Sequence, residues 1–97
     1  MSSLLEKQAD LLSAMANAKR LQVLLLISNR EWNVADLAQA VDLSQSALSQ
    51  HLAKLRKQKL VQTRREKQTV FYNCRSAKVL AILSCLELIS EKLCEAA

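Results

Sequence analysis

The chain has 97 residues and a formal net charge of +5, and 51% of its residues are hydrophobic although it has only one Trp, one Tyr and one Phe. A chain of this length forms one small domain, residues 1–97, whose limited core must be built from Leu, Val, Ile and Ala. No apolar stretch approaches the ~20 residues that span a bilayer, and the N-terminus carries no apolar signal segment. We therefore expect a cytoplasmic protein without a membrane partner, in which the three cysteines are thiols.

Caps and apolar spacing mark the first helices, because the chain contains no Gly or Pro to mark their ends. Apolar residues recur along one stripe from about Leu4 to Met15, which predicts a helix. Asn17 is placed to cap a second helix, LQVLLLIS, whose apolar residues on all sides indicate a central position. The segment from Arg30 to Trp32 then predicts a short connector or edge strand, with Trp32 as its packing anchor.

The next segments predict two helices joined by a short turn. Asn33 is expected to cap the third helix, with Asp36 at the capping-box position. Ser44 is expected to cap the fourth helix, which runs to about Gln58.

The fourth helix separates an apolar face from a polar face that suits base recognition. Leu48, Leu52 and Leu55 fall within one narrow arc of the helical wheel. The opposite face is amide-rich, and Gln can pair with adenine while Ser can donate or accept. Its candidate base-reading residues are Gln45, Ser46, Ser49 and Gln50. A solvated face is the alternative, although such faces more often carry Glu and Lys pairs. His51 flanks the apolar arc, where packing or capping is expected ahead of a phosphate contact.

Two alternating segments, Leu60 to Arg65 and Thr69 to Asn73, predict a β-hairpin after this helix. Because no glycine is present, its loop is expected to be longer than two residues.

Positive charge is concentrated around this hairpin. Between Lys54 and Lys78 lie nine basic side chains and one acid, whereas the other residues hold five basic and eight acidic side chains. Such segregation is the footprint expected for a polyanion partner, and a solvated basic face is the alternative. The candidate contacts to a DNA backbone are Ser44, Lys54, Lys57, Arg64, Arg65, Lys67 and Gln68.

A final helix from about Ser76 to Cys94 has an apolar arc wider than packing on one side requires. A second copy of the chain is the expected cover, and together with the stripe of the first helix this predicts a two-fold dimer. Its two fourth helices would address successive half-sites about one turn of DNA apart. The candidate interface residues are Leu4, Leu5, Leu12, Val79, Leu83, Leu86 and Ile89.

The cysteines and the single His do not predict a catalytic or metal site. Cys85 and Cys94 lie on opposite sides of one helix, roughly 13 Å apart along it, so they cannot bridge within the chain. Cys85 is expected to be a small core or interface residue, whereas Cys74 and Cys94 are candidate sensor thiols, although the absence of a sensory role is favoured. No cofactor and no enzyme activity are expected, because the His has no apparent nucleophile partner and a phosphate loop would need glycine.

The runs LSAMANAKRLQVLLL and VADLAQAVDLSQSALSQHLAKLRKQKLVQTRREKQTVFY resemble the ArsR/SmtB family of winged-helix repressors, in particular the branch that contains NolR, HlyU and BigR. The resemblance covers nearly the whole chain. It implies a mainly α, winged helix-turn-helix fold with five helices, a β-hairpin wing before the fifth, and a homodimer through the first and last helices. It also implies inverted-repeat operators, repression or counter-silencing, base contacts from the fourth helix and backbone contacts from the wing.

The sequence departs from the family pattern in three places. Ala18 stands where the family often has proline, which alters the entry to the second helix. The metal ligands of the family's metal sensors are missing, since the region from Asn33 to Val41 has no Cys and the last helix has no His. Sulfur-responsive members carry a thiol on the second helix, where this chain has Leu24, Leu25 and Leu26.

The sequence therefore favours a sequence-specific dimeric repressor that binds double-stranded DNA. Two alternatives remain open at this point. One is a nucleoid-type protein or counter-silencer with little sequence preference, and the other is a protein-interaction module that uses the apolar face of the last helix.

Overall fold

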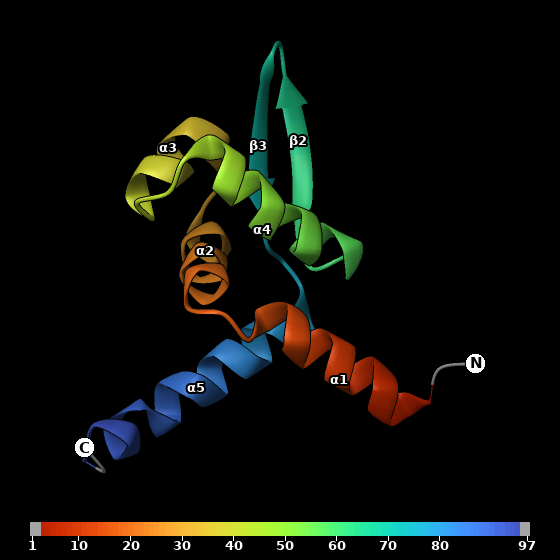
Figure 1. Ribbon diagram of the computed structural model, residues 1–97, viewed down its shortest axis with the longest axis vertical. Coiled ribbons are helices and arrows are strands. Elements are labelled where there is room, and N and C mark those ends of the chain that lie inside the picture. The colour runs from red at the N-terminus through yellow and green to blue at the C-terminus, as the bar shows by residue number, and fades with distance from the viewer. Residues whose placement is uncertain (1–2, 96–97) are drawn as a thin grey trace.

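The computed structural model describes residues 3–95, which form five helices and a three-stranded antiparallel sheet (Figure 1). The helices are α1 (Leu4–Met15), α2 (Ala18–Asn29), α3 (Val34–Ala40), α4 (Gln45–Lys57) and α5 (Ala77–Glu95). The strands are β1 (Trp32–Asn33), β2 (Gln62–Glu66) and β3 (Thr69–Asn73). A helix-turn-helix unit followed by a β-hairpin is the winged helix-turn-helix fold that the sequence predicts.

Polar side chains start all five helices. The residues are Ser3, Asn17, Asn33, Ser44 and Ser76, and each side chain accepts a hydrogen bond from the backbone N–H three residues later. The Asn33 amide also donates to the Asp36 carboxylate at 3.0 Å, which closes the predicted capping arrangement of α3.

Two turns that would usually contain glycine are made by Asp42 and Lys59, which take the left-handed conformation with φ of 57° and 58°. After α4, the Leu60 N–H reaches back to the Leu55 carbonyl at 3.0 Å, which is the helix-ending bond of a Schellman motif. The same pattern ends α3 at Asp42. The chain thus ends these two helices sharply without a glycine.

The wing is the hairpin of β2 and β3, and β3 is the central strand of the sheet, with β1 on its other side. Glu66 pairs with Thr69, so only Lys67 and Gln68 form the turn. The expectation of a longer loop is therefore wrong. The turn closes in two residues because Lys67 adopts φ 57°, a conformation that a non-glycine residue takes at some cost in strain.

The core lies between α2, α3 and α4 and is completed by β3 and the start of α5. Its buried residues include Met15, Val23, Leu24, Ile27, Leu37, Val41, Leu48, Leu52, Leu55, Leu60, Val61, Tyr72 and Val79. Leu60 and Val61 were expected to begin the hairpin, but the strand starts after them because they are buried here. The helix α2 was expected to be surrounded by the core, but only one side of it is buried, since Leu25 is 52% exposed. Trp32 anchors β1 as expected, and its indole N–H donates to the Leu26 carbonyl at 3.1 Å.

The helices α1 and α5 diverge at the end of the molecule opposite the wing (Figure 1). Exposed apolar side chains gather on them: Leu4, Leu5 and Leu12 on α1, and Leu80, Leu88, Ile89 and Leu93 on α5. Val79 and Leu83 were expected at a dimer interface, but they are 0% and 9% exposed and belong to the chain's own core, on the part of α5 that meets α2.

Within residues 3–95 no single helix is long and apolar enough to cross a membrane, and α1 and α2 meet those criteria only as a pair bent by 88°.

Candidate nucleic-acid interface

The outer face of α4 presents polar side chains opposite its buried leucines. Leu48, Leu52 and Leu55 are each at most 1% exposed, so the inner face is held by the core. The candidate base-reading residues are all exposed: Gln45, Ser46, Ser49 and Gln50. The rigid packing of one face therefore fixes the direction in which the other face points.

The start of α4 and the tip of the wing open onto one groove. Gln45 from α4 and Gln68 from the wing both line it, together with Asn33, Asp36 and Thr69 near their helix and strand ends. Figure 1 shows α4 lying beside the base of the wing. The fold thus brings together two segments that the sequence assigned separately to bases and to backbone.

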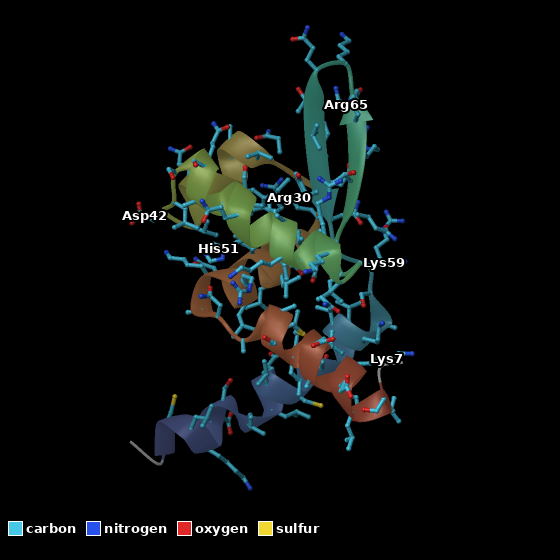
Figure 2. All side chains as sticks on the ribbon, turned by 45° about the vertical axis from the view of Figure 1, so that its right-hand side comes forward. Lys7, Arg30, Asp42, His51, Lys59 and Arg65 are labelled. Atoms are coloured by element: carbon cyan, nitrogen blue, oxygen red, sulfur yellow. The ribbon has the colours of Figure 1, made fainter. Side chains whose placement is uncertain are left out.

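Basic side chains extend this surface at both ends. Lys54 and Lys57 are exposed in the last turn of α4, where a cation is also favoured by the partial negative charge of the helix C-terminus. Arg65 and Lys67 are exposed on the wing, and Figure 2 shows Arg65 on its outer half. This arrangement suits contacts to phosphates on either side of a groove that receives α4.

Arg64 differs from these basic residues because it is paired within the chain. Its Nε and Nη2 each donate to the Glu31 carboxylate at 2.9 Å, and its Nη1 donates to the Glu66 carboxylate at 3.2 Å. Its guanidinium also stacks on Phe71, 4.7 Å from the ring centroid. The hydrogen bond from Arg64 is the main cause that holds the pKa of Glu31 below its usual value, and the same bond is the main cause that raises the pKa of Arg64. This geometry disfavours the expected role of Arg64 at the DNA backbone, since three of its five N–H donors already face carboxylates.

Behind α4, the buried Arg20 links His51 to the end of α1. The Arg20 Nε donates to the Ala14 carbonyl at 2.6 Å and the Nη2 donates to the Ser13 carbonyl at 3.3 Å. The Nη1 lies 3.2 Å from His51 Nδ1, and because a guanidinium can only donate, Nδ1 is the acceptor and the imidazole proton sits on Nε2. Burial, followed by the positive charges of Arg20 and Lys54, lowers the pKa of His51. His51 thus packs within the domain, as expected, and holds α4 to its neighbours.

The structure separates the three thiols. Cys74 is 2% exposed and its backbone N–H donates to the Ile27 carbonyl at 3.1 Å, so this candidate reactive thiol is shielded in the core. Cys85 and Cys94 are exposed on α5, so Cys85 is not a core residue of this chain. Among the described residues, no three His, Cys, Asp or Glu side chains are grouped so that they could hold a metal ion.

The fold together with the surface of α4 and the wing defines a winged helix-turn-helix DNA-binding domain. Residues 17–63 match the family described as bacterial regulatory protein, arsR family. The transcriptional activator HlyU of Vibrio cholerae is 49% identical over 90 residues, which are 93% of this chain and 81% of HlyU. The crystal structure of NolR from Sinorhizobium fredii has a TM-score of 0.86 at 49% identity and covers 92% of this chain and 96% of the NolR chain.

A third similar structure is the homodimeric winged helix-turn-helix DNA-binding domain of Mb0332 from Mycobacterium bovis, solved in solution. Its TM-score is 0.83 at 28% identity, covering 97% of this chain and 87% of that chain. The chain belongs to the ArsR family of DNA-binding transcription regulators, as its motifs implied.

Proposed function

We propose that this chain is a homodimeric, sequence-specific regulator that binds an inverted-repeat operator and represses transcription by occupying it. The observation that carries the proposal is the outer face of α4, where two amides and two hydroxyls are exposed on a helix fixed by buried leucines. In a major groove, amides pair with adenine edges and hydroxyls donate or accept, so these side chains would set the sequence preference. The residues assigned to this task are Gln45, Ser46, Ser49 and Gln50.

The backbone contacts are assigned to exposed side chains around this face. They are Ser44 at the start of α4, Lys54 and Lys57 near its end, and Arg65, Lys67 and Gln68 on the wing. Each cation that neutralises a phosphate releases counterions and steepens the salt dependence of binding by about 0.9 in a plot of log K against log salt.

The dimer is assigned to the apolar faces of α1 and α5. Leu5 on α1 is 76% exposed and Ile89 on α5 is 45% exposed, and burying a side chain of this size contributes roughly 1.5–3 kcal/mol. Leu4 and Leu12 on α1 and the half-buried Leu86 on α5 complete the proposed interface. The homodimeric state of the Mycobacterium bovis domain supports this assignment. A two-fold axis would place the two α4 helices in successive major grooves, about 34 Å apart.

Repression follows from occupancy when the operator overlaps the site where polymerase binds. HlyU is named an activator, and the same domain would activate transcription if it displaced a silencing protein instead. A reporter driven by the bound promoter separates the two: loss of this chain is expected to raise expression, and a fall in expression would contradict repression.

Fluorescence anisotropy tests the proposed DNA binding. The reduced protein is titrated into duplexes that tile the DNA upstream of its own gene, with a shuffled duplex as control, at two salt concentrations. Tight binding to one tile over the control is the expected result. Equal binding to every tile would support the nucleoid alternative instead. No binding at either salt would favour a protein-interaction module that uses the apolar face of α5.

A further inference from the structure

Arg64 ties together all three strands of the sheet on one face. It projects from β2, lies over Phe71 of β3, and reaches Glu31, the residue that precedes β1. The Arg64–Glu31 contact is bidentate, and Arg64 and Phe71 are partners in the β2–β3 register. A planar guanidinium holds a carboxylate in a fixed orientation, which a lysine cannot do.

Arg64 and Arg65 point to opposite faces of the wing, because neighbouring residues of a strand alternate. Arg65 is paired across the ladder with Val70, which packs against the core and lines the groove shared with Gln45. Arg65 therefore lies on the face of the wing that borders the proposed DNA surface, and Arg64 lies on the other face.

The charge around Arg64 is also unfavourable for a phosphate. Glu31 and Glu66 both lie within 3.2 Å of its guanidinium, so the three side chains together carry a net negative charge. Three of the five N–H donors of Arg64 already face carboxylates, so a phosphate would approach a guanidinium whose charge is already compensated. By contrast, no salt bridge within residues 3–95 engages Arg65 or Lys67.

The wing needs such a support because little else holds its outer half. All five residues of β2 are exposed, β1 is only two residues long, and beyond Arg64 the ladder has two residue pairs. Lys67 lies three residue steps beyond Arg64, about 10 Å along an extended chain, so a tilt of about 10° at Arg64 would move the tip by roughly 2 Å. A displacement of that size is enough to break a hydrogen bond to a phosphate.

We propose that Arg64 and Glu31 form a positioning pair that fixes the angle of the wing against DNA, and that Arg64 is not itself a phosphate ligand. The pair rests on the proposed DNA-binding function and assigns separate roles to adjacent arginines. Arg65 and Lys67 bind the backbone, while Arg64 holds them in place through a carboxylate contributed by the connector that follows α2.

The substitution Glu31→Gln gives the sharpest test, because the two accounts predict opposite signs. If only charge mattered, removing a negative charge from the protein would tighten binding to the DNA polyanion. The positioning account instead expects Glu31→Gln to weaken operator binding about three- to tenfold, with the salt slope unchanged within about half a unit. Arg64→Lys keeps the charge but loses the bidentate contact, so it should weaken binding to a similar extent.

Arg65→Gln is the matched control, since it removes a neighbouring arginine from the other face. It is expected to lower the salt slope by about one unit, as loss of one phosphate contact does. The double variant Glu31→Gln/Arg64→Gln should bind DNA no more weakly than the more weakly binding of its two single variants. The losses do not add because each substitution breaks the same Arg64–Glu31 contact. Melting curves of each variant establish that the domain is folded.

The single variant Arg64→Gln is measured as well, and its salt slope is expected to stay unchanged because Arg64 makes no phosphate contact. Three results would overturn the positioning pair: tighter binding by Glu31→Gln, full affinity in Arg64→Lys, or a salt slope in Arg64→Gln that falls as it does in Arg65→Gln. Failure of the proposed function is distinguishable, because the unsubstituted protein would then bind operator and shuffled duplex equally.

Discussion

Arg20 is a buried cation that holds the end of α1 to α4, so its removal is expected to destabilise the whole domain. It is 8% exposed, and its partners are the Ser13 and Ala14 carbonyls and the His51 ring. The last turn of α1 contains no basic residue of its own, so Arg20 from the next helix supplies the cation that this helix end favours. Within residues 3–95 no carboxylate forms a salt bridge with it.

The size of the effect follows from these contacts. Hydrogen bonds to a charged group contribute about 1.5–3 kcal/mol each, and Arg20→Ala would leave the Ser13 and Ala14 carbonyls and the His51 Nδ1 without this donor. We therefore expect Arg20→Ala to lower the free energy of unfolding by about 3–5 kcal/mol, a large part of the roughly 5–15 kcal/mol that holds a domain folded. For a domain of this size the melting temperature should fall by roughly 15 °C or more.

Urea denaturation at fixed protein concentration measures this loss, since dissociation of a dimer would otherwise shift the midpoint. Arg30→Ala is the matched control: Arg30 is exposed and lies over the Trp32 ring at 3.6 Å, a contact that contributes about 0.5–1 kcal/mol. If Arg20→Ala costs no more than Arg30→Ala, the linking role of Arg20 is wrong.

Three further predictions concern the pH dependence, a strained turn and the dimer. The pKa of His51 is lowered from 6.5 by burial and nearby cations, so the stability that this residue contributes is complete above about pH 6.5 and is lost as the pH falls through the pKa of the folded state. Thermal melts at several pH values follow this loss, which should vanish in His51→Gln. Lys59→Gly should raise the unfolding free energy by about 0.5–1 kcal/mol because it relieves a left-handed lysine, whereas Asp42→Gly should gain less because Asp tolerates that conformation better; equal effects would contradict this explanation. Ile89→Glu on the exposed face of α5 should dissociate the dimer in sedimentation experiments, and Ser84→Glu serves as a control on the polar part of the same helix; a dimer that persists in Ile89→Glu would remove α5 from the interface.

Most of the fold depends on interactions between residues that are close in sequence, so it could be predicted from the sequence. Asn17, Asn33 and Ser44 mark the helix starts because their side chains satisfy the first free N–H groups, and that interaction spans only three residues. The spacing of leucines in α4 likewise reports which face is buried. The polar face of α4 could be identified for the same reason, since it is what the leucines leave exposed.

The parts that could not be predicted depend on contacts between distant segments. Glu31 and Arg64 are far apart in sequence, so their contact has no local sequence signal. Arg64 and Arg65 differ only in the face of the strand on which they lie, and alternation assigns that face only once the side of the strand that packs on the core is known. The two-residue turn was missed because a left-handed Lys67 is an uncommon substitute for glycine. Cys74 follows the wing in sequence, but the chain re-enters the core there and buries it.

One signal for Arg20 was present in the sequence. It stands three, four and seven residues before Val23, Leu24 and Ile27, which is the spacing of one helix face. Those three residues are buried, and a cation on the same face must either pair or reach helix carbonyls. The spacing therefore indicated a buried cation, although its partners on α1 and α4 depended on the fold.

The substitution Gln50→Ala tests most directly whether α4 reads sequence. Affinity for the operator and for a shuffled duplex is measured by anisotropy at the same salt concentration, with Gln39→Ala on the exposed side of α3 as the matched control. We expect Gln50→Ala to lose about 1–3 kcal/mol on the operator and much less on the shuffled duplex, while Gln39→Ala changes neither. Equal losses on both duplexes would contradict base recognition by this face of α4.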